Sequence, residues 1–282
     1  MKSILPAIAI GLAILSPQAS ASPLKDAAFH RIVNDVEVVS SQGARRRAAE
    51  HEAFDTDASI RAGSRSRAEI IFSDHTVARV GAETSLKLQP GTRELSLDRG
   101  TLLLQVPKFR GGARIRAGSL ALACGGATIL VEHLPGKSLK AVVLEGELRV
   151  SVTRFLGDSI VVSAGKMLIV NPDVKRIPDP VDTDLRTLVS TSTLINPAAF
   201  GGEIAPLASL PQIVREIARQ EDEVQKKRLI RTNLAIFGSG TNVMIPRGSA
   251  TATDMSENKT RVNEREAAAL AASQSQIAEA KP

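Results

Sequence analysis

Between Val36 and Val170, short runs of alternating apolar and polar residues are separated by glycines. The glycines recur at roughly ten-residue intervals, and no apolar pattern with helical spacing interrupts them. This regular spacing of short strands is typical of an all-β sandwich, barrel or solenoid. It predicts a mainly β fold with a single domain of short antiparallel strands, sandwich-like or solenoid-like.

The clearest hairpin signal runs from Ser66 to Gly81. Two alternating runs flank Asp74 and His75, which we expect to form a tight two-residue turn, although His75 stands where such a turn prefers glycine. Alternation places the side chains of the first run on two faces. The predicted core face carries Ala68, Ile70 and Phe72, and the opposite face carries Glu69 and Ser73.

Aromatic residues make up 2% of the chain, with no Trp and no Tyr. The core is therefore predicted to be aliphatic, and stacking platforms for sugars or single-stranded nucleic acids are not expected. The formal net charge of +6 permits an acidic partner without requiring one. The arginine run Arg45–Arg47 is interpreted as a solvated strand edge or loop, with an anion contact as the alternative.

Residues for catalysis or metal binding are not recognisable in the sequence. His30, His51, His75 and His133 lack the spacing of a zinc site. The single cysteine, Cys124, lies in an apolar run and is predicted to be a small buried hydrophobic residue. No nucleophile elbow, Walker loop or dinucleotide fingerprint is present. We therefore expect no catalytic residues, no metal, no cofactor and no enzyme.

Four cations surround the Gly111-Gly112 pair and form the candidate anion-binding site: Lys108, Arg110, Arg114 and Arg116. Alternation predicts that Arg114 and Arg116 share one face of a strand, with Lys108 and Arg110 on the preceding strand. Such a patch suits phosphate or carboxylate groups. We favour a solvated, charged hairpin that discourages edge pairing, with the anion-binding patch as the alternative.

The N-terminus has the pattern of a signal peptide over residues 1–21. Lys2 precedes the apolar run Ile4–Leu15, and Ala19–Ala21 is an A-x-A cleavage site. We expect cleavage after Ala21, a mature chain that begins at Ser22, and a periplasmic or secreted location. No later stretch has the length and apolarity of a transmembrane segment, so none is expected in the mature chain.

The remainder of the chain divides into two further parts. Residues 172–247 are predicted to be a proline-containing linker with a helical extension. Its expected helices are Asp182–Leu194, capped by Asp182 or Thr183, and Pro211 to about Arg231. Residues 248–282 contain almost no large apolar side chains, and we expect a disordered tail.

Several motifs resemble the FecR family of bacterial envelope proteins. Residues 22–171 are assigned to a FecR-like β-domain, within which the resemblance runs from about Val36 to Asn171. The family pattern Ser-x-Ala-x-hydrophobic-x-Phe-x-Asp-Gly-Thr is matched at Ser66, Ala68, Ile70, Phe72, Asp74 and Thr76, with His75 replacing the glycine. Further similarity lies at Gly125–Val131, Val143–Val150 and Ala164–Lys166.

The resemblance implies a role outside the cytoplasmic membrane. In signalling members, such a domain passes a signal from an outer-membrane transporter to a sigma factor, through a membrane helix and an anti-sigma segment. This chain resembles the exported sensor part without those two segments. We therefore expect a non-enzymatic protein-interaction, signalling or scaffold module of the cell envelope. The alternative is a module that binds an anionic envelope polymer through the basic hairpin. The expected partner is an envelope protein or such a polymer, and no nucleic acid.

Overall fold

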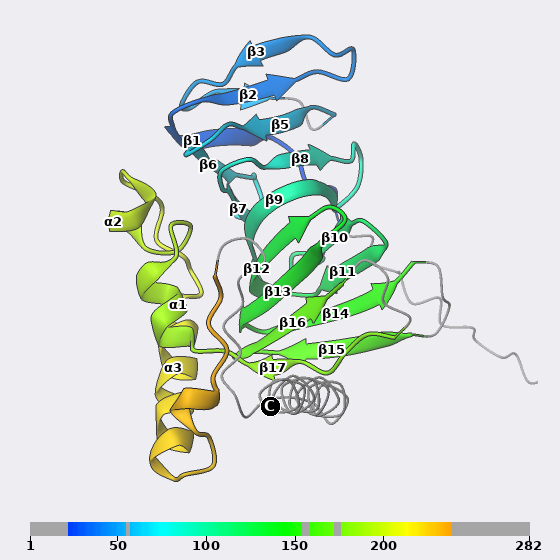
Figure 1. The fold of residues 1–282 in the computed structure, drawn as a ribbon. Helices are drawn as coiled ribbons and strands as arrows, with labels where there is room; N and C mark the ends of the chain where they lie inside the picture. The colour runs from blue at the N-terminus through cyan, green and yellow to red at the C-terminus, as the bar shows by residue number, and fades with distance from the viewer. Residues whose placement is uncertain (1–21, 55–56, 154–157, 172–175, 239–282) are drawn as a thin grey trace, which may run out of the picture.

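The computed structural model describes residues 22–54, 57–153, 158–171 and 176–238 (Figure 1). Within these ranges the chain forms two β-sheets followed by a helical segment, which confirms the predicted mainly β fold with helices after it. The predicted signal peptide and the predicted tail lie outside the described residues.

Sheet A is antiparallel throughout its described strands, with the order β4-β1-β6-β7-β9-β12-β13-β16-β17. Its strands are β4 Ala53–Phe54, β1 Ala27–Val33, β6 Arg67–Ile71, β7 Val77–Val80, β9 Glu94–Val106, β12 Ala127–Leu134, β13 Ser138–Glu145, β16 Lys166–Val170 and β17 Val181–Asp182.

Sheet B has the order β3-β2-β5-β8-β9-β10-β11-β14-β15. Its other strands are β3 Arg45–Arg47, β2 Val36–Val39, β5 Ser59–Ala62, β8 Ser85–Leu88, β10 Ala113–Ala117, β11 Leu120–Cys124, β14 Glu147–Val152 and β15 Ser159–Ser163. The pairing of β9 with β10 is parallel, whereas the other described pairings of this sheet are antiparallel.

Strand β9 belongs to both sheets. Its first half pairs with β8 and β10 in sheet B, and from Gly100 onward it pairs with β12 in sheet A. Gly100 has a φ of +95°, and a Cβ atom there would lie 2.4 Å from Thr84. Glycine is therefore required where the strand changes sheet, because a side chain would clash and the left-handed backbone would be strained. The shared strand holds the two sheets together as a sandwich.

The main core lies between the two sheets and is largely aliphatic, as predicted. Ala68, Ile70 and Phe72 are buried in it, which confirms the predicted core face of the first hairpin. Phe29 and Phe54 stack with their ring centroids 4.6 Å apart and add the main aromatic contact. Alternation along each strand thus directs one set of side chains into this layer.

The turn of the β6–β7 hairpin is longer than the predicted two residues. The Phe72 N–H donates to the Thr76 carbonyl at 3.0 Å, and the His75 N–H donates back to the Phe72 carbonyl at 2.9 Å. Ser73, Asp74 and His75 therefore form a three-residue loop. His75 has a φ of +66°, the left-handed position that a glycine usually fills in such loops. This geometry explains why the family pattern has glycine here.

The helical segment packs on the outer face of sheet A, along one side of the sheets in Figure 1. It consists of α1 Leu185–Thr191, α2 Pro197–Phe200, α3 Leu210–Gln225 and the 3-10 turn η1 Arg231–Asn233. The cap of α1 is Asp184, which accepts a hydrogen bond from the Thr187 N–H, so the predicted caps are wrong by one or two residues. Helix α3 ends earlier than predicted, and Lys227 beyond it is left-handed.

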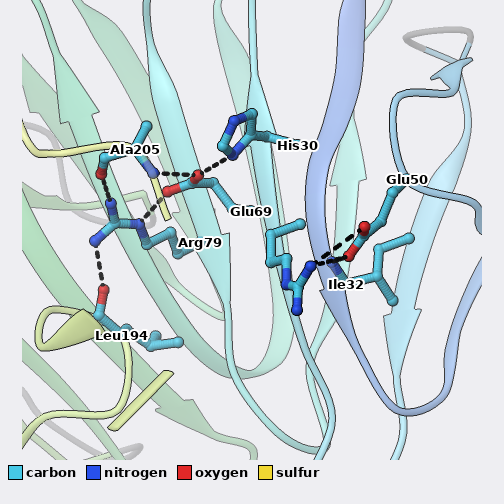
Figure 2. Close-up of polar contacts among 8 residues, drawn as sticks. His30, Ile32, Glu50, Glu69, Arg79, Leu194 and Ala205 are labelled. Atoms are coloured by element: carbon cyan, nitrogen blue, oxygen red, sulfur yellow. Dashed lines mark hydrogen bonds and ion pairs between the residues drawn. The ribbon is translucent and has the colours of Figure 1, made fainter. Parts of the chain in front are cut away.

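A buried ion pair lies at the seam between sheet A and this segment (Figure 2). Glu69 on β6 and Arg79 on β7 are 0% and 1% exposed, and Arg79 Nε lies 2.6 Å from Glu69 Oε2. Arg79 also donates to the carbonyls of Leu194 at 2.8 Å and Ala205 at 2.5 Å. The Ala205 N–H donates to Glu69 at 2.9 Å, and His30 Nδ1 lies 2.7 Å from the same carboxylate.

The charged forms of Glu69 and Arg79 are stabilised in this buried site by the groups around them. Burial lowers the pKa of the Arg79 guanidinium, and the Glu69 carboxylate opposes that effect. A guanidinium remains protonated under ordinary conditions, so the charge must be balanced within the structure. The segment that supplies the two carbonyls is therefore tied to the β6–β7 hairpin by charge as well as by apolar packing.

Replacing the buried Phe72 with alanine should lower the free energy of unfolding by about 3–5 kcal/mol, because it leaves a cavity between the sheets. Phe72 is 2% exposed, whereas Phe109 is 99% exposed. The matched variant Phe109→Ala should therefore change stability by less than about 0.5 kcal/mol. Urea unfolding followed by circular dichroism measures both, and equal losses would refute the assignment of the core face.

Replacing Arg79 with methionine should cost about 3–5 kcal/mol of unfolding free energy, because Glu69 would be left buried without its charge partner. The double variant Glu69→Leu, Arg79→Met removes both charges and should recover most of that loss. Urea unfolding of the two variants gives the comparison. A double variant less stable than Arg79→Met would show that the pair does not act as a unit.

Candidate functional site

The four cations of the predicted anion site do not share one face. Arg114 and Arg116 are exposed on the outer face of β10, as predicted. Strand β9 ends at Val106, so Lys108 and Arg110 lie in a loop, and the predicted preceding strand is wrong. Proline at 107 lacks the N–H that would continue the ladder, and the turn beyond it has left-handed residues.

Three of these cations have carboxylate partners. Glu94 on β9 contacts Arg116 and lies 3.9 Å from Arg114, since β9 and β10 are paired with Arg114 opposite Glu94. Lys108 Nζ lies 3.0 Å from Glu145 at the end of β13. Arg110 is exposed and has no ion pair among the described residues. The patch is thus partly neutralised by the chain itself.

The connection between β9 and β10, Pro107–Gly112, is here named the Phe109 loop. Phe109 is 99% exposed and left-handed, with a φ of +62°. At the base of the loop, the Arg93 guanidinium donates to the Gly112 carbonyl. A Cβ atom on Gly112 would lie 2.3 Å from the Cys124 carbonyl, so glycine allows the loop to seat against β11. An aromatic ring is therefore held in solvent by an anchored loop.

Arg93 connects this loop to the β6–β7 hairpin. Its Nη2 atom lies 2.5 Å from Asp74 Oδ2, and its Nη1 atom donates to the Ser22 carbonyl at 3.0 Å. Asp74 also accepts from the Thr76 N–H and hydroxyl at 2.9 and 3.0 Å. Burial alone would raise the pKa of the Asp74 carboxyl, but the hydrogen bonds from Arg93 and Thr76 hold it below its usual value.

A shallow hollow of about 410 Å³ lies beside this anchor. It is lined by Thr92, Arg93, Glu94, Gly111, Ala113, Arg114, Ala123 and Cys124. Burial raises the pKa of the Cys124 thiol to about 11, with smaller opposing effects from the Ala113 backbone and Arg93. The thiol is therefore protonated near neutral pH and is not an activated nucleophile. Its burial confirms the predicted small hydrophobic role.

The outer face of sheet B carries a larger set of cations than the sequence indicated. Cross-strand partners share a face, so the pairing register identifies the outward residues. The outward cations are Arg45, Arg47, Arg61, Lys87, Arg99, Arg114, Arg116 and Arg149. The outward carboxylates are Glu37, Glu94, Asp98 and Glu147.

Sequence reasoning missed this face because its cations lie on six strands that are separated in the chain. The arginine run Arg45–Arg47 forms the exposed edge strand β3, in agreement with its interpretation as a solvated edge. Phe109 was also missed. An aromatic residue between two cations and directly before a Gly-Gly turn was the available signal.

No group of three or more His, Cys, Asp or Glu side chains in the described ranges is arranged to hold a metal ion. None of the described helices combines the length and hydropathy needed to span a bilayer.

Comparison with protein families gives a match to the FecR protein family over residues 58–149. Residues 58–149 form a FecR domain. The FecR domain begins just before β5 and ends within β14. It therefore contains the Asp74 turn, Arg93, the Phe109 loop and most strands of sheet B. The strands β1–β4, the last strands of both sheets and the helical segment lie outside the match.

Two crystal structures, each of a protein proposed to be an anti-sigma factor from Parabacteroides distasonis, are similar to part of this chain. Their TM-scores are 0.39 and 0.38, with 15% and 14% sequence identity. Both alignments cover 47% of this chain and 64% of the other. No curated protein matches the chain.

The Asp74–Arg93 contact should make the stability of the FecR domain depend on acid. Because folding lowers the pKa of Asp74, its stabilising contribution is present above the unfolded-state value near 3.8 and is lost as the pH falls through the folded value. Asp74→Asn should cost about 1–3 kcal/mol at pH 7. Urea unfolding at pH 7, 5, 4 and 3 should show this difference shrinking below pH 4, and a difference that grows with acid would contradict it.

Proposed function

We propose that the protein is a non-catalytic interaction module of the bacterial cell envelope, exported through residues 1–21, that binds another envelope protein through the Phe109 loop. The observation that carries the proposal is the full exposure of Phe109 on a loop that is anchored at both ends. Large aromatic side chains that are exposed singly contribute nothing to the core of the free protein. In complexes they are among the residues that contribute most to affinity.

The anchoring of the loop supports this role. Arg93 binds the Gly112 carbonyl, and Lys108 pairs with Glu145, so the two ends of the loop are held in place. Binding then costs less conformational entropy than it would for an unanchored loop. Arg110, which is next to Phe109 and exposed, adds a forked donor for a carboxylate on the partner. A protein contact also agrees with the signalling role implied by the FecR domain.

The second candidate function is binding of an anionic envelope polymer through Lys108, Arg110, Arg114 and Arg116. The exposure of all four cations favours it. Their division between a loop and a strand face, and the pairing of three of them with Glu94 and Glu145, reduces the charge that this set offers as one patch. The protein contact is therefore the function that the geometry of this loop supports best.

Photocrosslinking tests the protein contact. With p-benzoylphenylalanine at position 109 of the full chain in its native host, ultraviolet light should produce an adduct with a defined envelope protein. The matched control places the same group at Val214 on α3, which is also apolar and exposed. Phe109→Ala should then lower capture of that partner about tenfold or more, the loss expected of a central aromatic anchor.

Two outcomes would overturn the proposal. Identical adducts from positions 109 and 214 would mean that crosslinking reports surface exposure alone. Undiminished capture by Phe109→Ala would mean that the ring is not the anchor. Since Phe109→Ala is expected to leave the fold intact, a loss of capture cannot be attributed to unfolding.

A further inference from the structure

The basic outer face of sheet B is separate from the Phe109 loop and offers a different kind of contact. We propose that this face binds an extended polymer with repeated anionic groups, laid across the strands. The proposal does not require the protein contact at Phe109. It rests on the register of the strands, the pairing of the charges and the size of the side chains between them.

The register aligns the outward residues in rows that run across the sheet. One row passes from Arg45 on β3 through Val39, Ser59, Lys87 and Ser96 to Arg116 on β10. A second row joins Arg47, Glu37, Arg61 and Ser85. A third row joins Glu94, Arg114, Ala123, Arg149 and Val161. Cations therefore recur along the direction that crosses the strands.

The length of these rows across the sheet suits a long ligand. Neighbouring strands lie roughly 4.8 Å apart, so the path from β3 to β14 follows about 34 Å of sheet. A single phosphate or carboxylate would contact one or two of the cations. A polymer with a charge on every unit would meet cations repeatedly along the same path, and each contact would release counterions from the polymer.

The cations on this face outnumber its four carboxylates, so the face keeps a net positive charge over the described residues. Arg45, Arg47, Arg61, Lys87 and Arg149 have no ion pair among the described residues. Glu94 is the carboxylate that contacts two of the face cations, Arg114 and Arg116. Cations that lie close together repel one another, so a bound anionic ligand would reduce the electrostatic repulsion within this face.

The residues between the cations favour a polymer over a protein surface. Several are serine or alanine, including Ser59, Ser96, Ala121 and Ser151, so the backbone of a chain-like ligand can approach the sheet. Stable protein interfaces usually have an apolar centre. Here the outward apolar side chains larger than alanine are Val39 and Val161, which lie near opposite edges of the sheet. An acidic protein would find no such centre.

The test uses the full chain and two named polymers, long-chain polyphosphate and polygalacturonate, which separate phosphate from carboxylate recognition. Affinity is measured by fluorescence anisotropy of labelled polymer at several salt concentrations. The face variant is Arg61→Gln, Lys87→Gln, Arg149→Gln. The control variant is Lys25→Gln, Lys137→Gln, Arg215→Gln, which removes the same charge from exposed cations outside the face.

The face variant should bind at least one polymer about tenfold or more weakly, and the slope of log affinity against log salt should fall by about two to three. The control variant and Phe109→Ala should bind like the original chain, and inorganic phosphate should not compete at matched phosphate concentration. Unfolding in urea should show that both triple variants remain folded, because the replaced side chains are exposed.

Three results would overturn the inference. Equal losses in the face and control variants would mean that net charge alone attracts the polymer. Unchanged binding by the face variant, or no binding of either polymer by the original chain, would mean that the face is not a polymer site.

Discussion

The buried pair of Glu69 and Arg79 is the interaction on which the arrangement of sheet A and the helical segment depends. Two charges that are closed off from water are tolerated when each finds its partner and its remaining hydrogen bonds. The carbonyls of Leu194 and Ala205, and the Ala205 N–H, complete that set. Separation of sheet A from the segment that covers it would break these hydrogen bonds and expose the apolar cluster between them to water.

The contact between sheet A and the helical segment removes the outer face of sheet A from the surface that could bind a ligand. The outer face of sheet A is covered by α1 and α3 and contributes to a second apolar core. The outer face of sheet B keeps its charged side chains in solvent over the described residues. The polar groups of the two faces thus have opposite roles. On sheet A they join the sheet to its covering segment, and on sheet B they are free to meet a ligand.

The turn that carries the family pattern has a supporting role in this molecule. Asp74 holds Arg93, and Arg93 holds the Gly112 carbonyl at the base of the Phe109 loop. The hairpin that most clearly marks the FecR domain is therefore connected to the loop with the exposed aromatic ring. Two contacts in series extend from the core hairpin to the base of the loop, so the base of the Phe109 loop is held by residues far from it in the chain.

Alternation in the sequence was enough to predict a mainly β fold and the inner face of the first hairpin, because alternation is a local property: Ala68, Ile70 and Phe72 were assigned correctly without any partner. It could not determine what covers the opposite face. Glu69 and Arg61 occupy similar alternating positions, yet one is buried beneath the helical segment and the other is exposed. Nor could it show that distant cations meet on sheet B, since strand register and the shared strand β9 bring them together. The burial of Glu69 and the gathering of these cations depend on strand register and on packing between layers, which a local pattern does not encode.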